Sequence, residues 1–442
     1  MMSRRRIRSI IALIACCLIC SAALGQTRAP RVAATLSATE QAAALDAIVT
    51  AFEAQYVFPE MRPRIVERLN AARRSGRYSV DDPVVFAERI TEDLRDVSHD
   101  KHLSLALDPV GYAAATAPPD SDEGAEALWR RRAIRNHHGV AEMRRFGGNI
   151  RYLRISGFEW TDDETGFAYD GAMRFLKDGD AAIIDIRGNG GGSHSAVRYL
   201  VSHFMRGDVL EMTFLQGAET PEQSRTLEHL PVGRLQGMPL YVLIDGGAAS
   251  AAEAFAYDVQ QFKLGELVGT RTAGAANNNR LLPIAPDFVL SVSYGRPLHP
   301  VSNSNWEGVG VSPTIEAPPA QALEIAQSLA LKRLSENSGA TAENLADYAW
   351  AKIAVESSLH PVTFTPAQLQ SLAGNYGRAK VDFRDRALWL TRPNRPTARL
   401  SPLTADGLFA VDRIDSLRVR LTGRTMELLR AGEPEPQVFP RG

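Results

Sequence analysis

Ser250 is the residue of this chain whose type and position most directly suggest chemistry. The segment from Tyr241 to Tyr257 predicts a buried strand, a turn of small residues and a helix that begins at Ser250. A helix N-terminus presents unpaired N–H groups and the positive end of the helix dipole, which can stabilise an alkoxide or an oxyanion. Ser250 and Glu253 also have the spacing of a capping box, which is a purely structural arrangement. This segment by itself leaves both interpretations open.

A glycine-rich turn is the second candidate. Residues 181–187 predict a buried strand, and Gly188, Gly190 and Gly191 follow it before a helix over 194–204. Such a turn can aim backbone N–H groups at an anion, as in an oxyanion hole, or can simply connect a strand to a helix through positive φ angles. A dinucleotide site fits poorly, because Ser193 stands where the fingerprint needs a third glycine and no Gly-Lys-Ser/Thr follows.

Two further segments carry groups that could act on a serine. His99, Asp100 and His102 lie close together near the end of a predicted helical region, and Glu307 sits in a turn between Trp306 and a glycine. A metal site at the histidines is disfavoured, because the chain has no His-Glu-x-x-His motif and no obvious further ligand. The pattern assigns no chemistry to the remaining histidines, which are His137, His138, His194, His203, His229, His299 and His360.

Taken together, these segments resemble the carboxyl-terminal-processing serine peptidase family, and most closely its tricorn-like and interphotoreceptor-retinoid-binding-protein-like branch. The resemblance covers roughly residues 40–316 and rests on motifs in the same order along the chain. Those motifs are Tyr56–Glu60 with Asp100–Leu103, Asp185–Gly192, Gly247–Glu253, Gly269–Asn277 and Asn305–Val311.

The resemblance implies a role for each candidate residue. Ser250 would be the nucleophile, His102 the general base and Glu307 the group that orients the base. The N–H of Ala251 and the Gly190–Gly191 turn would form the oxyanion hole. The chemistry is consistent with this assignment, because a serine nucleophile needs a base and the base needs a third group to fix its tautomer. No metal ion or organic cofactor is implied.

The chain departs from the family pattern in three places. Ala275 stands where the Ser/Lys members of the family carry a lysine, which favours a Ser-His-Glu set and leaves Lys101 as the alternative base to consider. The 46 residues between His102 and the first core strand at Asn149 are too few for a PDZ module, so specificity for free C-termini is not implied. Some tricorn-like members place a second serine beside the histidine, where this chain has Lys101.

The N-terminus predicts a secretory signal peptide over residues 1–25. Four arginines precede an apolar run, and small residues follow it up to Gly25, so cleavage there would leave Gln26 first. Removing those arginines takes the formal net charge from −1 to −5, and a mildly acidic chain without a basic tract argues against nucleic acid as a partner. All three cysteines lie inside this segment, so the mature protein would have no disulfide or catalytic thiol. A lipobox-like sequence ending at Cys16 offers a membrane-anchored lipoprotein as the alternative.

These observations predict an α/β protein with a crotonase/ClpP-like β/α core. After the signal peptide we expect an N-terminal helical domain over 37–108, a serine peptidase core over 126–318, a helical connector over 319–360 and a C-terminal β-rich accessory module over 363–440. The expected function is an exported, periplasmic or secreted serine-type peptidase that acts on peptide or protein substrates and has no membrane-spanning segment after cleavage. The alternatives are a non-catalytic carrier of apolar ligands on the same fold and an esterase with the same triad. The sequence leaves the oligomeric state open.

Overall fold

The computed structural model describes residues 35–118, 121–217 and 220–442 of the chain. They form two compact units, which are described separately. The first contains Leu153–Asp178 and Ile184–Glu316 with the described residues up to Met143, and the second contains Arg144–Tyr152, Gly179–Ile183 and Ala317–Gly442. The predicted signal peptide, with Cys16, lies outside the described residues. Within the described ranges, no helix is both long enough and apolar enough to cross a membrane.

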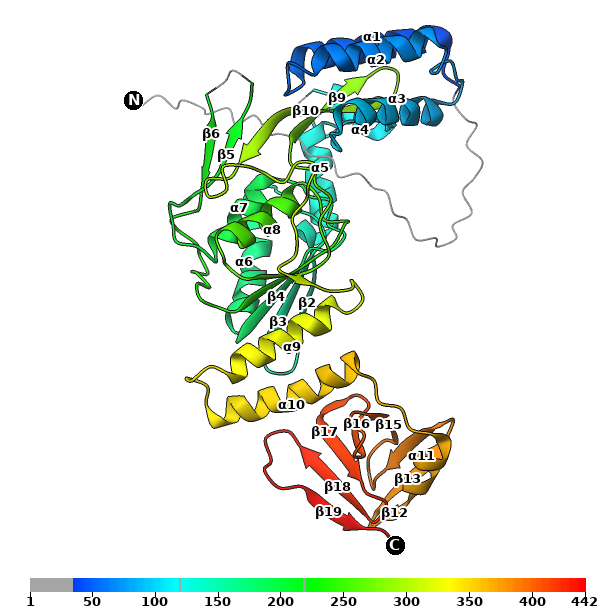
Figure 1. Ribbon diagram of the computed structural model, residues 1–442, viewed down its shortest axis with the longest axis vertical. Helices are drawn as coiled ribbons and strands as arrows, with labels where there is room; N and C mark the ends of the chain where they lie inside the picture. The colour runs from blue at the N-terminus through cyan, green and yellow to red at the C-terminus, as the bar shows by residue number, and fades with distance from the viewer. Residues whose placement is uncertain (1–34, 119–120, 218–219) are drawn as a thin grey trace. The chain divides into compact units, whose positions relative to one another are not determined.

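Three helices form the N-terminal segment, and the first and third of them begin at side-chain caps. They are α1 (Ala38–Gln55), α2 (Arg62–Arg74) and α3 (Pro83–Ser98). Ser37 and Glu40 form the predicted capping box of α1, and the Asp82 carboxylate accepts N–H groups from the first turn of α3. The apolar faces of these helices share one core with Phe288 and Leu290 of a long strand later in the chain (Figure 1).

That long strand, β10 (Phe288–Leu298), gathers segments that are far apart in sequence. Its first residues pair antiparallel with β1 (Ser104–Leu107) and with β9 (Asn278–Ile284), and its last residues pair with β5 (Leu210–Leu215). The sheet has the order β1-β10-β5-β6, where β6 is Glu222–Arg225. Since β1 follows His102 directly and β9 follows Asn277, this pairing brings the histidine segment to the loop that precedes β9.

A second sheet of six strands has the order β11-β8-β7-β4-β3-β2. Its members are β2 (Val140–Arg145), β3 (Ile150–Ile155), β4 (Ala181–Asp185), β7 (Leu240–Ile244), β8 (Glu266–Gly269) and β11 (Ile315–Glu316). Every residue of β4 and β7 is buried, as expected for strands covered on both faces. Together with its helices, this sheet confirms the predicted α/β class.

Two strand–turn–helix units of the first unit position the site. The glycine-rich turn leads from β4 into α7 (His194–Ser202), and the Ser250 turn leads from β7 into α8 (Ala251–Gln261). α7 and α8 pack against each other, as Figure 1 shows. The other helices of this unit are α4 (Pro109–Thr116), α5 (Ala125–Arg135), the short 3₁₀ helix η1 (His137–Gly139) and α6 (Asp163–Lys177).

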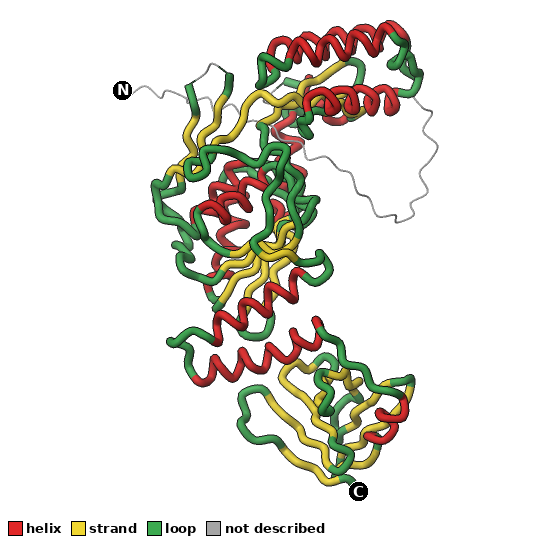
Figure 2. The backbone as a smooth tube through the Cα atoms, viewed as in Figure 1, coloured by secondary structure: helices red, strands yellow, loops and turns green. Residues whose placement is uncertain are grey.

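The second unit ends in an antiparallel meander. The helices α9 (Ala322–Ser335), α10 (Ala342–Leu359) and α11 (Pro366–Leu372) come first, and the strands that follow are neighbours in chain order. They are β12 (Gly374–Tyr376), β13 (Ala379–Arg384), β14 (Ala387–Thr391), β15 (Ala398–Pro402), β16 (Leu408–Val411), β17 (Ile414–Leu421), β18 (Thr425–Arg430) and β19 (Gln437–Pro440). Tyr376 pairs with Arg441, which joins the first strand to the end of the last (Figure 2). An eight-stranded barrel has room for little beyond side chains, and a single apolar core is found in this sheet. The predicted all-β module is therefore confirmed.

Candidate active site

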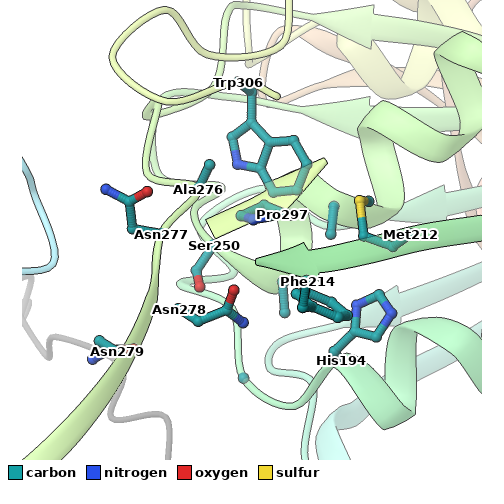
Figure 3. A pocket seen from close by; sticks show the side chains of 13 residues that line it. His194, Met212, Phe214, Ser250, Ala276, Asn277, Asn278, Asn279, Pro297 and Trp306 are labelled. Carbon is teal, nitrogen blue, oxygen red and sulfur yellow. The ribbon is translucent and has the colours of Figure 1, made fainter. Parts of the chain in front are cut away.

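Ser250 occupies a strained backbone position at the start of α8. Its φ of 54° and ψ of −119° put a non-glycine residue in the left-handed half of conformational space. Such a conformation costs about 1–3 kcal/mol and persists only where the surroundings enforce it. A serine on a sharp, strained turn between a strand and a helix is the arrangement known as a nucleophile elbow. Ser250 also lines a pocket of the first unit, into which Figure 3 shows its hydroxyl pointing.

The carboxylate of Glu253 holds this turn in place. It is completely buried and accepts hydrogen bonds from the Ser250 N–H at 3.1 Å, the Ala275 N–H at 2.8 Å, the Gly274 N–H at 2.6 Å and the Thr272 hydroxyl at 2.5 Å. Burial raises the pKa of Glu253, although these hydrogen bonds oppose the rise. Glu253 is therefore more than a local cap, because it ties the nucleophile turn to the loop that precedes β9.

The glycine-rich turn packs directly against the nucleophile. A Cβ atom added to Gly191 would lie 2.7 Å from the Ser250 Cβ and 3.0 Å from the Ala251 nitrogen, and Gly191 has a φ of +109°. Only glycine fits there. The two turns are joined further, since Asp245 accepts the Gly188 N–H at 2.9 Å.

The backbone N–H groups of the predicted oxyanion hole differ in whether they already have a hydrogen-bond acceptor. The Gly191 N–H donates to the Asn189 side chain at 2.8 Å. The N–H groups of Gly190 and Ala251 have no acceptor among the described residues. Of the predicted donors, the Gly190 and Ala251 N–H groups are therefore free to bind a ligand, whereas Gly191 would first have to release Asn189.

His102 lies in a buried pocket of carboxylates. Its backbone N–H donates to Asp100 Oδ1 at 2.9 Å, and its Nδ1 is 3.7 Å from the same oxygen. Both ring nitrogens are buried without a hydrogen-bond partner among the described residues, so the imidazole is not bonded to Ser250 in this structure. Catalytic hydrogen bonds are often long before substrate binds, so this geometry does not disqualify the base.

Glu307 reaches the same loop as Glu253. Its Oε2 accepts the Ala276 N–H at 2.5 Å and the Asn277 N–H at 3.0 Å, while its buried Oε1 has no partner in the described part of the chain. Burial and the negative charge of Asp100 raise the pKa of Glu307, and the charge of His102 acts in the opposite direction. Glu307 is thus electrostatically coupled to the histidine without bonding to it.

Asp100 was named with the histidines in the sequence but was given no catalytic role there, and the structure places it beside His102. Its Oδ2 accepts a hydrogen bond from the Asn277 side chain at 3.1 Å and from the Tyr56 hydroxyl at 3.4 Å. Burial acts to raise its pKa, but hydrogen bonding to His102 and the charge of His102 outweigh burial, so the pKa of Asp100 is lowered. The signal was its position two residues before the proposed base.

Lys101 has a structural partner. Its ammonium group donates to the Ala273 carbonyl, on the same loop that Glu253 and Glu307 bind. Ala275, which stands where the Ser/Lys members have their lysine, is nearly buried and donates its N–H to Glu253. This contact gives Lys101 a role in fixing the loop.

The pocket beside Ser250 is largely apolar. It has an apolar wall with a few polar groups, and Figure 3 shows most of these side chains. The lining residues are Gly192, His194, Met212, Phe214, Ser250, Ala251, Ala254, Ala276, Asn277, Asn278, Asn279, Pro297 and Trp306.

Comparison with known proteins identifies the central part of the chain. Residues 149–317 match the family model described as peptidase family S41. The chain contains a peptidase family S41 domain. The predicted family is thereby confirmed for this segment, and the assignment to the tricorn-like branch stays a prediction.

Two curated relatives are carboxy-terminal processing enzymes. The "Carboxy-terminal processing protease CtpB" of Bacillus subtilis (strain 168) is 28% identical over 183 residues, which are 40% of this chain and 35% of the relative. The "C-terminal processing peptidase, chloroplastic" of Tetradesmus obliquus is 27% identical over 177 residues, which are 38% of this chain and 35% of the relative. The matched region thus spans about a third of each relative.

Solved structures show weaker likeness. A lipoprotein from Streptococcus agalactiae aligns with 70% of this chain and 100% of its own at 15% identity and a TM-score of 0.46. The tricorn protease aligns with 66% of this chain and 37% of its own at 12% identity and a TM-score of 0.43.

The role of Glu253 can be tested by Glu253→Gln. An amide has one acceptor atom instead of two, so buried N–H groups of the loop lose their partner. We expect the free energy of unfolding to fall by about 2–3 kcal/mol, measured by chemical denaturation. The control is Glu228→Gln, an exposed glutamate whose replacement should change stability by less than about 0.5 kcal/mol. Equal stability of Glu253→Gln and the wild type would contradict the role given to this carboxylate.

Proposed function

We propose that this protein is a serine peptidase that hydrolyses peptide bonds through an acyl-enzyme on Ser250. The observation that carries the proposal is the strained Ser250 at the start of α8, held by Glu253, backed by Gly191 and open to a pocket. The family match over the same segment supports it. We also propose that the core is crotonase/ClpP-like. The proposed domains are the helical domain over 37–108, the core over 126–318, the connector over 319–360 and the β-rich module over 363–440.

The proposed reaction starts with attack of the Ser250 Oγ on the scissile carbonyl carbon. His102 takes the hydroxyl proton, and the C–O bond that forms places negative charge on the carbonyl oxygen. The N–H groups of Ala251 and of the Gly190–Gly191 turn receive this oxyanion. His102 then protonates the leaving amine as the C–N bond breaks. A water molecule, deprotonated by His102, attacks the acyl-enzyme and releases Ser250.

Two carboxylates are available to support the imidazolium of His102. Glu307 is the proposed orienting group, and its unpartnered buried Oε1 is suited to bond the ring when His102 moves toward Ser250. Asp100 lies 3.7 Å from Nδ1 and already holds the backbone of His102. We assign Asp100 to positioning the histidine segment and Glu307 to stabilising the positive charge.

We also propose that the protein is exported by its N-terminal signal and that the mature chain begins at Gln26. The composition of residues 1–25 supports this proposal. N-terminal sequencing of the protein recovered outside the cytoplasm tests it. Recovery of an acylated Cys16 would contradict soluble export and indicate a lipid-anchored protein.

Ser250→Ala tests the nucleophile. Loss of a covalent nucleophile costs on the order of a million-fold in turnover, so this variant should neither cleave a mixture of unstructured peptides nor react with a fluorophosphonate probe. Ser79→Ala, at an exposed serine of the helical segment, is the matched control and should behave as the wild type.

The same experiment separates the alternatives. If Ser250 were only a helix cap, Ser250→Ala would lose about 1 kcal/mol of stability and keep its activity. Cleavage of esters but not of peptides would indicate an esterase. A wild-type protein that ignores the probe and binds an apolar ligand would be a carrier, and the proposed function would be wrong.

The base is tested by comparing His102→Gln with Lys101→Met across pH. An imidazole base predicts that turnover is lost at acidic pH, because a protonated imidazole accepts no proton. We expect His102→Gln to be inactive and Lys101→Met to be active but less stable, since its contact with the Ala273 carbonyl is lost. An active His102→Gln and an inactive Lys101→Met would move the base to Lys101.

Glu307→Gln should retain more turnover than His102→Gln.

A further inference from the structure

His194 lies in the pocket of Ser250 and is held there by a buried acid. It is the first residue of α7, directly after the glycine-rich turn, and its side chain is 20% exposed (Figure 3). Its Nε2 is 3.1 Å from Glu211 Oε2 and 3.2 Å from the Ser224 hydroxyl, which itself donates to Glu211 at 2.8 Å. No local sequence pattern links His194 to these residues, because Glu211 lies in β5 and Ser224 in β6.

Glu211 is a negatively charged residue that is closed off from solvent. It is fully buried, and Asp258 of α8 faces it. Burial and the charge of Glu211 raise the pKa of Asp258 well above its ordinary value, which favours the neutral form of Asp258 beside Glu211. Burial acts to raise the pKa of Glu211, but the charge and hydrogen bond of His194 outweigh burial and lower it.

The other histidine of this cluster cannot balance that charge. His299 lies 3.4 Å from Asp258, is completely buried, and burial lowers its pKa to about 4, so it is neutral near pH 7. Within the described part of the chain, His194 is the group at ion-pair distance from Glu211 that can carry a positive charge. A buried carboxylate requires such a partner, and the Nε2 of His194 is held against Glu211 for this reason.

The remaining ring nitrogen of His194 is left for a ligand. Nε2 is engaged with Glu211 and Ser224, and the hydrogen bonds of the ring among the described residues are both made by Nε2 rather than Nδ1. Phe214 packs against the imidazole with ring centroids 4.7 Å apart, and with Met212 it forms an apolar wall of the pocket. The N-termini of α7 and α8 both open on this pocket, and their positive dipole ends also favour an anion.

We infer that His194 is a specificity-determining residue that binds a substrate carboxylate in the pocket beside Ser250. The inference rests on the proposed function and names the substrate class of the same site. A group with a short apolar stem and a terminal carboxylate fits a pocket with an apolar wall and one imidazole whose Nε2 is already held by a buried acid. The carboxylate comes either from an acidic side chain next to the scissile bond or from the free C-terminus of the substrate.

The test uses the full chain and a set of peptides that differ only in the residue before the scissile bond. That residue is glutamate, glutamine or leucine, and each peptide is made with a free and with an amidated C-terminus. Cleavage rates and protection of Ser250 from a fluorophosphonate probe are both measured, so binding is read even where cleavage is slow. The wild type should prefer a carboxylate over its amide by about tenfold or more. A preference that follows the side chain identifies an acidic residue, and one that follows the free terminus identifies the C-terminus.

His194→Gln should remove this preference while Ser250 still reacts with the probe. Glu211→Gln keeps the imidazole but removes the charge behind it, and should weaken the preference in the same direction. His229→Gln, at an exposed histidine outside the pocket, should leave the preference unchanged. Equal handling of carboxylate and amide by the wild type, or an unchanged preference in His194→Gln, would overturn the inference. Absence of probe labelling in the wild type would instead overturn the proposed function.

Discussion

Three carboxylates bind one short loop, those of the buried Glu253 and Asp100 and of the half-buried Glu307, and the site depends on that arrangement. Glu253 accepts the N–H groups of Gly274 and Ala275, Glu307 accepts those of Ala276 and Asn277, and Asp100 accepts the Asn277 side chain. A buried carboxylate without donors is strongly unfavourable, and consecutive backbone N–H groups of a loop are among the few donors that can satisfy it. The three acids come from α8, from the turn before β11 and from the end of α3. The loop therefore links Ser250, the segment of His102 and Glu307, which are the proposed nucleophile, base and orienting acid.

Backbone strain at Ser250 is maintained by the same network. Glu253 holds the Ser250 N–H, and Gly191 fits against the Ser250 Cβ only because it lacks a side chain. The glycine-rich turn and the nucleophile turn are thus mutually dependent. A change at either turn would shift the oxyanion donors and the hydroxyl together, which is why a small movement at this point has large consequences for catalysis.

Local patterns predicted the elements of the site well. The apolar runs of β4 and β7, the small-residue turn before Ser250 and the capping box at Ser37 each depend on neighbouring residues, and the structure contains all of these elements. The contacts between these elements could not be predicted from local patterns in the same way. The spacing of Ser250 and Glu253 indicated a local cap, whereas Glu253 also binds a loop some twenty residues away. The pairing of β1 with β10 and of His194 with Glu211 depends on tertiary structure that no local pattern encodes.

We propose that the loop of residues 272–277 presents His102 to Ser250 during the reaction. A crystal structure of the protein with Ser250 covalently trapped by a fluorophosphonate would show whether this is so. We expect His102 Nε2 to lie within hydrogen-bond distance of the Ser250 Oγ, Glu307 to bond Nδ1, and the phosphonyl oxygen to receive the N–H groups of Ala251 and the Gly190–Gly191 turn. A trapped structure in which the Lys101 ammonium group approaches Ser250 and His102 stays unpartnered would contradict it.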